Sequence, residues 1–400
     1  MAWIRSLVYR TSLLRRKERD MSSAQLEGGI ESSRAFGSPK SISLRACRAS
    51  QKAMESLLDF LQSNWRYIVF LSPVLSIFSY ASLRHYTEVG RKRRCVQNER
   101  VLILGGSSGI GLEIARQYLT SGGAAEVFLV GRNSGKLNEA LDHCRSILED
   151  DGGGGDKRKG RVVGLTADLS SVEDMIRVKD KVVEEFGGIN TLIVSAGVSA
   201  TRPLLDIASS SSPSEGIHRA VSVANSALQS NYIGPLVAAV TFIPLLQQAS
   251  PNTPAILLIS SLASVIPAPT RTLYGSTKAA SLMLYQSLAI EHPGIRWSFV
   301  LPSTVRGGFR GSAIDVDVQS DSKANNAKDT SAKFTASTME GLKVEDVARR
   351  CIVAIERGEK LVFFPSFMPR IGHFLYWLWP GFVERKAMKK YGFISQTSSS

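Results

Sequence analysis

The stretch VLILGGSSGIG, residues 101–111, decides the fold of this chain. Its first four residues, Val101–Leu104, have the length and composition of a buried strand, and a glycine-rich turn follows them directly. Gly105, Gly109 and Gly111 permit a tight turn and the close approach of a pyrophosphate to the next helix. The free N–H groups and the dipole at that helix N-terminus favour anions. The stretch therefore predicts a dinucleotide-binding unit.

Strand and helix signals alternate along residues 99–365, which we interpret as one domain. This repeat predicts an α/β fold, a Rossmann-type doubly wound parallel sheet with helices on both faces. The expected strands are 101–104, 126–130, 162–166, 191–195, 256–260, 297–301 and 361–364. The expected helices are 112–120, 136–149, 171–186, a long one around 219–248, 274–291 and 343–357. Residues 151–160 and 311–338 are polar and lack periodicity, so we expect loops there.

The segments before this domain have a different composition. Residues 1–64 form a basic arm that we expect to be disordered, or to be a targeting signal. The stretch Tyr67–Leu83 has no charged residue and lies at the short edge of what spans a bilayer. We expect a hydrophobic anchor helix at 65–86, and the sequence does not decide whether it spans the membrane or only anchors the chain to it.

The formal net charge of +14 is concentrated in the arm and beside the predicted anchor. The first 52 residues hold eleven Lys and Arg against four acids, and residues 91–94 read RKRR. No basic helix interleaved with aromatics occurs in the middle of the chain, so nucleic acid is not an expected partner. The more basic flank lies after the anchor, which predicts a cytosolic main domain.

The four cysteines are widely scattered. They have neither metal-ligand spacing nor the pattern of a disulfide framework, so we expect no metal site and a reducing compartment.

Residues 366–400 form an aromatic and basic extension. Its uncharged stretch Ile371–Val383 is too short to span a bilayer, and a basic run follows it. A core helix is one interpretation. An interfacial segment beside a lipid entrance is the interpretation we prefer.

The residue after the second expected strand predicts which dinucleotide binds. An acid about twenty residues beyond the glycines is typical of an NAD site, where it binds the ribose hydroxyls. Here Arg132 stands at that place, and a guanidinium suits the 2′-phosphate of NADP. Lys136 is close enough in sequence to assist.

The stretch SLASVIPAPTRTLYGSTK, residues 261–278, carries a candidate proton-transfer group. Tyr274 and Lys278 are four residues apart and share one face of a helix. An ammonium there favours the phenolate and draws the tyrosine pKa down from about 10. Ser261, at the end of a strand-like run, could hold the same substrate oxygen that the tyrosine protonates.

Taken together, these motifs resemble the short-chain dehydrogenases/reductases over roughly residues 99–365. The motifs are LGGSSGIG at 104–111, ADLS at 167–170, SAG at 195–197, NYIG at 231–234, ISS at 259–261 and YGSTK at 274–278. In that family the tyrosine is the acid/base, the serine orients the carbonyl, the lysine binds the nicotinamide ribose, and an asparagine holds a proton-relay water. The resemblance implies these roles for Tyr274, Ser261, Lys278 and Asn231.

The resemblance also implies the cofactor contacts. NADP(H) is the expected cofactor, with Asp168 in the adenine region. The expected contacts are Gly105, Ser107, Ser108, Gly109, Ile110, Gly111, Arg132, Asp168, Ala196, Gly197, Tyr274, Lys278 and Pro302.

Three departures from the family pattern concern the scaffold more than the proton-transfer group. Leu104 stands where a threonine is usual before the first glycine. Residues 194–197 read VSAG instead of Asn-Asn-Ala-Gly, and Pro302 is followed by serine instead of glycine, with Gly307 where a threonine is frequent. These departures put cofactor affinity, more than activity, in question.

The sequence thus predicts an NADPH-dependent oxidoreductase that reduces a ketone on a lipid-like molecule. Within the family, the anchor, the arginine and the aromatic-basic end resemble membrane-associated lipid or steroid reductases. A hydroxysteroid or retinoid dehydrogenase and a membrane-tethered nucleotide-binding scaffold with a weakened site are the alternatives. Expected partners are a lipid-like ketone or alcohol and a membrane, with homo-oligomerisation left open.

The expected location is the endoplasmic reticulum membrane with a cytosolic domain. A mitochondrial membrane and a lipid droplet are the alternatives. The substrate and the physiological direction of the reaction are not readable from the sequence.

Overall fold

The structure is a computed structural model of the 400-residue chain, which divides into two compact units, Met1–Leu83 and Arg84–Ser400. It describes residues 99–120, 125–150, 160–248, 253–315 and 341–393, together with positions 72, 76, 79 and 80. Those four positions in the first unit are helical. The rest of the predicted anchor at 65–86, the arm at 1–64 and most of the two predicted loops lie outside the described residues.

The second unit contains a seven-stranded parallel sheet with the order β3-β2-β1-β4-β5-β6-β7. The strand order reverses between β1 and β4, which makes that position the topological switch point of a doubly wound sheet. The strands are β1 (Arg100–Leu104), β2 (Glu126–Gly131), β3 (Arg161–Thr166), β4 (Thr191–Val194), β5 (Ala255–Ile259), β6 (Arg296–Pro302) and β7 (Leu361–Phe364). The predicted fold class is therefore confirmed.

Side chains alternate across β1 because successive residues of a strand point to opposite faces. Leu102 and Leu104 join one apolar cluster, while Val101 and Ile103 join the other. Both faces of the central strands are thus buried, which explains why the strands read as continuous apolar runs.

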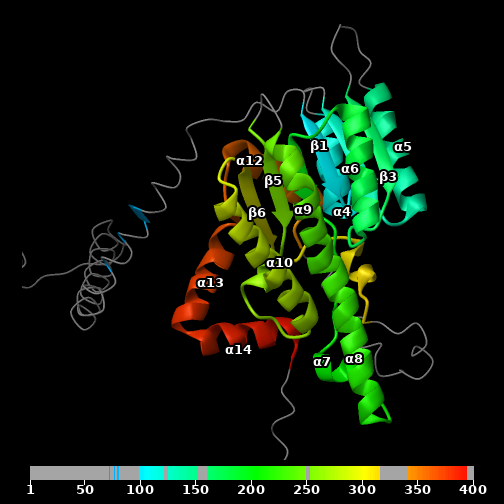
Figure 1. The fold of residues 1–400 in the computed structure, drawn as a ribbon. Helices are drawn as coiled ribbons and strands as arrows, with labels where there is room; N and C mark the ends of the chain where they lie inside the picture. The colour runs from blue at the N-terminus through cyan, green and yellow to red at the C-terminus, as the bar shows by residue number, and fades with distance from the viewer. Residues whose placement is uncertain are drawn as a thin grey trace, which may run out of the picture. The chain divides into compact units, whose positions relative to one another are not determined.

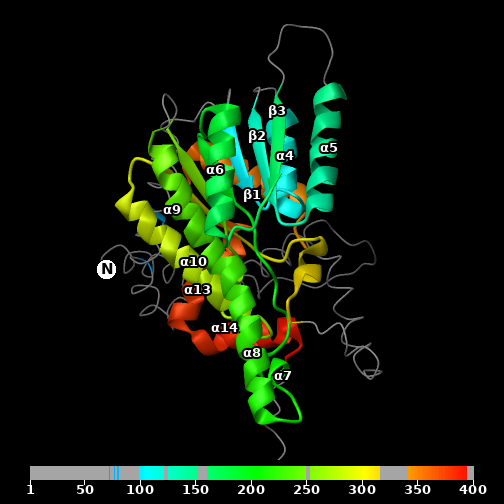
Figure 2. The same ribbon diagram turned by 45° about the vertical axis from the view of Figure 1, so that its right-hand side comes forward.

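Helices cover both faces of the sheet (Figures 1 and 2). One face packs on α6 (Val172–Phe186), α9 (Gly234–Gln247) and α10 (Thr272–Glu291). The other face packs on α4 (Gly109–Thr120), α5 (Ser134–Asp150) and α12 (Val344–Arg357). Cys144 and Cys351 lie buried among the residues of this second layer as free thiols, and burial raises the pKa of each thiol, to about 11 and about 12 respectively.

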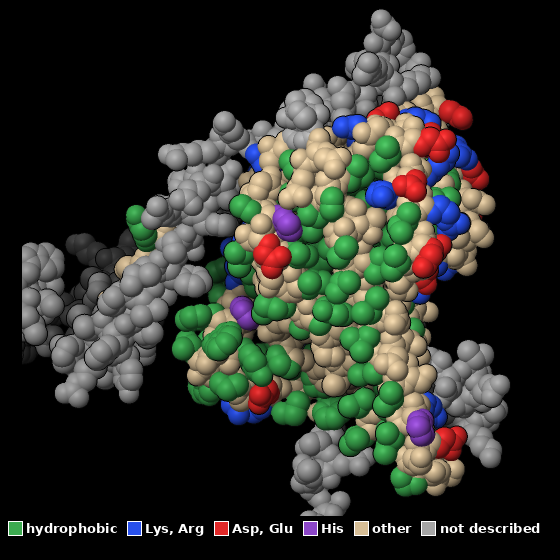
Figure 3. Space-filling view, in the orientation of Figure 1, with side chains coloured by type: hydrophobic (Ala, Val, Ile, Leu, Met, Phe, Trp, Pro, Cys, Tyr) green, Lys and Arg blue, Asp and Glu red, His purple; other side chains and the backbone are tan. Residues whose placement is uncertain are grey.

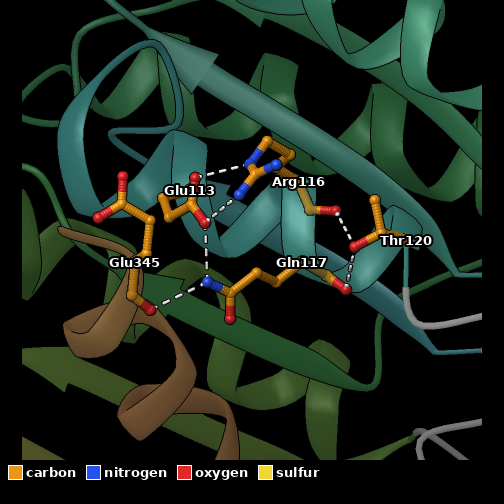
Figure 4. Close-up of polar contacts among 5 residues, drawn as sticks. All are labelled: Glu113, Arg116, Gln117, Thr120 and Glu345. Atoms are coloured by element: carbon orange, nitrogen blue, oxygen red, sulfur yellow. Dashed lines mark hydrogen bonds and ion pairs between the residues drawn. The ribbon is translucent and has the colours of Figure 1, made fainter. Parts of the chain in front are cut away.

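A polar cluster links two helices of the second layer (Figure 4). The Arg116 guanidinium donates to the Glu113 carboxylate within α4, and this hydrogen bond holds the pKa of that carboxyl below its usual range. Gln117 donates both to Glu113 and, at 3.0 Å, to the Glu345 carbonyl at the start of α12. These contacts position α12 against α4 although the two helices are far apart in sequence.

The long helix predicted around 219–248 is three consecutive segments and begins earlier. It consists of α8 (Pro213–Leu228), a π-helical turn, η1 (Gln229–Ile233), and α9. Pro213 occupies a first-turn position, where a missing N–H costs nothing. No apolar stripe in the sequence marks the early start, because α8 buries only Gly216 and Ala227. A further short helix, α7 (Leu204–Ile207), precedes it.

Within the described residues, Pro213–Gln247 is the helical stretch long and apolar enough to cross a membrane. Its α9 half instead packs against the sheet, with Val237, Phe242 and Leu246 in the core. We therefore interpret the α9 half of this stretch as a core helix of the domain.

After β7 the chain forms α13 (Phe367–Leu378) and α14 (Pro380–Tyr391). Because β7 is parallel to its neighbours, both helices follow the carboxyl end of the sheet, and Figures 1 and 2 show them beside α10 and α8 at that end. The predicted segment Ile371–Val383 is thus two helices, and most of its large side chains are exposed rather than in the core.

Candidate active site

The predicted site residues lie at the carboxyl ends of the strands, where open α/β sheets bind their ligands. The first of them follow β1. The backbone N–H groups of Gly105 and Gly106 both donate to the Val130 carbonyl, which fixes the turn onto the end of β2. Gly105 has a φ of 89°, and a Cβ on it would lie 2.5 Å from the Ala196 nitrogen. Glycine at this position therefore lets the turn pass the segment after β4.

The glycine turn leaves room at the helix N-terminus for a ligand. A Cβ on Gly111 would meet the Gly105 carbonyl oxygen at 2.2 Å, so this glycine brings the first turn of α4 against the turn itself. Gly109, with a φ of 57°, faces open space, and a Cβ there would meet no atom within 4 Å. Ser108 is exposed beside it. The first N–H groups of a helix have no partner within the helix, so the start of α4 next to this open space suits a pyrophosphate.

Arg132 extends from the end of β2 toward η1. Its Nη1 lies 3.4 Å from the Ser230 Oγ, and the side chain is exposed. Lys136 is exposed in the first turn of α5, where its N–H donates to Asn133 Oδ1. Two exposed cations at the end of β2 can bind an added phosphate on a ribose.

Asp168 lies after β3 and holds its own loop. Its Oδ1 accepts from the N–H and the hydroxyl of Ser170, and its backbone N–H donates to Asp174 at 2.7 Å. These contacts of Asp168 thus stabilise the turn between β3 and α6, and its adenine contact stays a prediction.

Ser261 and Tyr274 are brought together by the close packing of α10 on the turn that follows β5. Ser261 has an extended backbone and caps the 3-10 helix η2 (Leu262–Ser264), with its Oγ accepting from the Ala263 N–H at 3.2 Å. A Cβ on Gly275 would lie 2.9 Å from the Ala263 carbonyl oxygen. This glycine therefore lets the first turn of α10 approach η2, and the Tyr274 phenol hydrogen-bonds the Ser261 side chain.

The electrostatics of Tyr274 differ from the sequence-based expectation. Burial raises the pKa of Tyr274, and the hydrogen bond with Ser261 and the charge of Arg271 act against that rise. Arg271 lies one residue before α10, with its guanidinium carbon 5.8 Å from the centre of the Tyr274 ring.

Lys278 is buried one turn further along α10. Its Nζ donates to the Ile259 carbonyl at 3.2 Å, and burial lowers the pKa of Lys278 to about 8. A Cβ on Gly197 would lie 3.0 Å from this Nζ and 2.8 Å from the Asn231 Oδ1. The loop after β4 thus passes close to both side chains, and a larger residue there would have to displace at least one of them.

Asn231 is fully buried in η1, and its amide group is occupied by protein atoms. Its Oδ1 accepts from the Val198 N–H at 2.8 Å, and its Nδ2 donates to the Val198 carbonyl and to the Thr277 hydroxyl, both at 3.1 Å. The side chain therefore joins the loop after β4 to α10. A π-helical turn also leaves main-chain groups out of the α-helical pattern, as often occurs at functional sites.

Two residues that the sequence did not single out complete the surroundings of Tyr274. Arg271 is 9% exposed, and its Nη1 donates to the Ser199 hydroxyl at 2.8 Å and to the Ala200 carbonyl at 3.2 Å. The Phe309 ring, in the 3-10 helix η3 (Gly308–Ser312), lies 5.9 Å from the Tyr274 ring. Both contacts join segments distant in sequence, and no local pattern signals them.

The remaining predicted cofactor residues surround the same edge. Ala196 donates its N–H to the Leu104 carbonyl, and Pro302 is buried at the end of β6. Leu104, the departure from the usual threonine, is fully buried in the core.

This fold and edge define a class of protein, the nicotinamide-dinucleotide oxidoreductases with a doubly wound sheet. The family model described as short chain dehydrogenase matches residues 99–315. The chain belongs to the short-chain dehydrogenase family.

Two curated relatives show where in the family the similarity lies. The chain is 26% identical over 302 residues to "Dehydrogenase/reductase SDR family member 7B" of Danio rerio, covering 74% of this chain and 86% of that protein. It is 29% identical over 278 residues to "11-beta-hydroxysteroid dehydrogenase-like 2" of Arabidopsis thaliana, covering 68% and 75%. Its motifs also resemble dehydrogenase/reductase family member 7 and 3-ketodihydrosphingosine reductase, and the first relative agrees with the former.

A solved structure shows the same fold. A short-chain dehydrogenase/reductase from Burkholderia phymatum in complex with NAD has a TM-score of 0.55 and 19% identity. The similarity covers 76% of this chain and 98% of the chain of that structure.

Proposed function

We propose that this chain is an NADPH-dependent reductase of a ketone on a lipid-like molecule. The observation that carries the proposal is the pairing of Tyr274 with Ser261 at the edge that also bears the glycine turn. A buried phenol held by a hydroxyl can deliver a proton to an oxygen placed between them.

The residues present fit the expected dinucleotide. Open space beside Gly109 suits its pyrophosphate, and Arg132 with Lys136 suits a 2′-phosphate. When bound, the nicotinamide supplies a hydride for the carbonyl carbon. Tyr274 protonates the carbonyl oxygen as it gains negative charge, and Ser261 keeps that oxygen in reach. Lys278, close to Gly197, is available to hold the ribose.

The cofactor part of the proposal is tested by comparing NADPH and NADH binding. Replacing Arg132 with alanine removes a charge-assisted contact worth about 1.5–3 kcal/mol, so we expect roughly ten- to hundredfold weaker NADPH binding. NADH binding should be unchanged, because NADH lacks the phosphate. Isothermal titration calorimetry of the purified full chain measures both.

The matched control for Arg132→Ala is Arg145→Ala, which removes an exposed arginine from α5. It should leave both affinities unchanged. Equal losses for both nucleotides in Arg132→Ala, or tighter binding of NADH than NADPH by the unaltered chain, contradict the NADPH assignment.

The substrate class is proposed on the aromatic surroundings of Tyr274 and on the predicted membrane anchor. Phe309 contacts the Tyr274 ring, so the region where the ketone lies is partly apolar. A panel of long-chain keto lipids, steroid ketones and short water-soluble ketones tests the class. Turnover restricted to the short ketones contradicts a lipid-like substrate.

A hydroxysteroid dehydrogenase is the second candidate, favoured by the similarity to proteins named 11-beta-hydroxysteroid dehydrogenase-like. It predicts NADPH-dependent turnover of the steroid ketones of the panel and none of the long-chain keto lipids. For location, we propose the endoplasmic reticulum membrane with a cytosolic domain. Fluorescent tagging with protease protection tests both the organelle and the side.

A further inference from the structure

The outward side of α13 is an exposed apolar surface. Phe367, Ile371, Phe374 and Leu378 recur at the spacing of one helix stripe, and Trp377 is 79% exposed. We call the following residues the α13 face: Phe367, Met368, Ile371, Phe374, Trp377, Leu378 and Trp379. Figure 3 shows hydrophobic side chains gathered over this part of the molecule. Contiguous exposed apolar area of this kind marks an interaction site.

The opposite side of α13 is attached to the domain, so the exposure is a property of the folded unit. His373 Nδ1 lies 3.3 Å from the Val265 carbonyl oxygen, and its ring lies 5.8 Å from that of Phe363 in β7. Pro369 is buried, and Gly372 lies close to Ile266. The helix thus has one side fixed beside η2 and the other side facing outward.

The helix that follows adds positive charge next to this face. Arg385, Lys386, Lys389 and Lys390 belong to α14, against the single acid Glu384. Basic side chains beside a Trp-rich apolar face are complementary to an anionic bilayer surface. The apolar tip formed by α7 and α8 differs, because Leu205 and Ile217 there lie close in sequence to Asp206 and Glu215.

The length of α13 determines how it can meet a bilayer. Twelve residues of α-helix extend about 18 Å, which is far short of a hydrocarbon core of about 30 Å. Tryptophan and tyrosine prefer the level of the lipid headgroups. An orientation in the plane of the surface satisfies both the apolar side and the basic neighbour.

We propose that α13 and α14 lie on the surface of an anionic phospholipid bilayer, with the α13 face in the lipid and the α14 lysines at the headgroups. This segment of the chain is a different one from the predicted anchor at 65–86.

The docked surface lies beside the active site. Figures 1 and 2 show α14 beside α10, the helix whose first turn carries Tyr274. A lipid-like ketone leaving the bilayer next to α14 is therefore close to the group that protonates it. This consequence rests on the proposed function, whereas the docking itself does not.

Tryptophan fluorescence of the full chain tests the docking without any turnover. The chain is reconstituted in vesicles of phosphatidylcholine and phosphatidylserine whose acyl chains carry bromine, which quenches tryptophan in contact with lipid. Because the chain has five tryptophans, the signal is the emission of the unaltered chain minus that of Trp377→Phe/Trp379→Phe. We expect this difference emission to lose most of its intensity relative to vesicles of unbrominated lipid.

Two further variants sharpen the test. The triple change Lys386→Gln, Lys389→Gln and Lys390→Gln should reduce the quenching when phosphatidylserine is present and leave it unchanged in phosphatidylcholine alone. As a matched control, Val183→Trp in the Trp377→Phe/Trp379→Phe chain places a tryptophan at an exposed position late in α6. Its added emission should not be quenched.

Difference emission that bromine does not quench overturns the proposal, because protein, either a second copy or another part of this chain, then covers the α13 face. Quenching that the triple lysine change leaves intact overturns the role of α14. If NADPH-dependent turnover fails while the quenching persists, the proposed function is wrong and the docking stands.

Discussion

Tyr274 is subject to opposing influences at the scale of a single residue. Burial favours the neutral phenol, while Ser261 and the Arg271 charge favour the phenolate. The lysine four residues on is itself buried and held by the Ile259 carbonyl. We therefore propose that Arg271 is a positioning residue for Tyr274, acting through its charge and through its hydrogen bonds to the loop after β4.

Replacing Arg271 with glutamine should move the pH dependence of the reaction upward. Loss of the positive charge raises the pKa of Tyr274 further, so the phenolate needed for alcohol oxidation forms only at higher pH. We expect the rising limb of kcat/KM for oxidation of the alcohol product to shift to higher pH.

Arg271→Lys is the control for this change, since it keeps the charge and should restore the limb toward its original position. If the rising limb of the kcat/KM profile stays at the same pH in Arg271→Gln, the charge of Arg271 does not act on the Tyr274 phenol. An equal upward shift in both variants shows a packing effect instead.

At the scale of elements, glycines decide how closely the segments of the site approach. Gly105, Gly111, Gly197 and Gly275 each lie where a Cβ would be 3.0 Å or less from an atom of another segment. The α4 N-terminus, the loop after β4 and the first turn of α10 therefore meet at distances that larger residues do not allow.

Gly111→Ala tests this account of the turn. The added Cβ would lie 2.2 Å from the Gly105 carbonyl oxygen, a backbone atom that cannot rotate away. We expect a loss of about 1–3 kcal/mol in unfolding free energy, as for overpacking in a core, together with weaker dinucleotide binding. Chemical denaturation of the full chain measures the first effect and calorimetry the second.

Gly308→Ala is the matched substitution, because a Cβ there meets nothing within 4 Å. It should change stability by no more than about 0.5 kcal/mol. Similar losses in the two variants would falsify the close-approach argument.

The elements themselves were largely readable from the sequence. All seven strands were predicted within one residue at each end, because buried parallel strands are short apolar runs between turns. The start of α8 was missed by six residues, since a helix that buries little has no apolar stripe. The exposed position of α13 was not decided by its composition, because an aromatic segment of that length suits either a core or an interface.

Site residues that belong to a local sequence motif could be predicted from the sequence. Site residues that come together only through tertiary packing could not. Tyr274 and Lys278 follow from their spacing, and Arg132 from its place after a strand. Arg271 and Phe309 reach Tyr274 only through the packing of α10 and η3, which no local pattern records. The hydrogen bonds of the Asn231 side-chain amide with Val198 and Thr277 likewise join residues far apart in the sequence.

At the scale of the whole second unit, the candidate site and helices α13 and α14 all lie at the carboxyl ends of the strands. The glycine turn, the Ser261–Tyr274 pair and the helices α13 and α14 all follow strand ends at that edge. The opposite edge carries none of the predicted site residues. Under our proposals, this one end of the domain both binds the dinucleotide and lies on the lipid surface.

We propose that Tyr274 delivers the proton as a hydride passes from NADPH to a ketone of a lipid. The direct measurement uses NADPH deuterated at the transferred position, a lipid extract and the purified full chain, with mass spectrometry of the products. Tyr118→Phe, a tyrosine-to-phenylalanine change in α4 away from the site, is the matched control.

The unaltered chain and Tyr118→Phe should each produce a lipid alcohol carrying one deuterium, and Tyr274→Phe should bind NADPH yet produce none. Formation of the same labelled alcohol by Tyr274→Phe at the unaltered rate would show that Tyr274 does not deliver the proton.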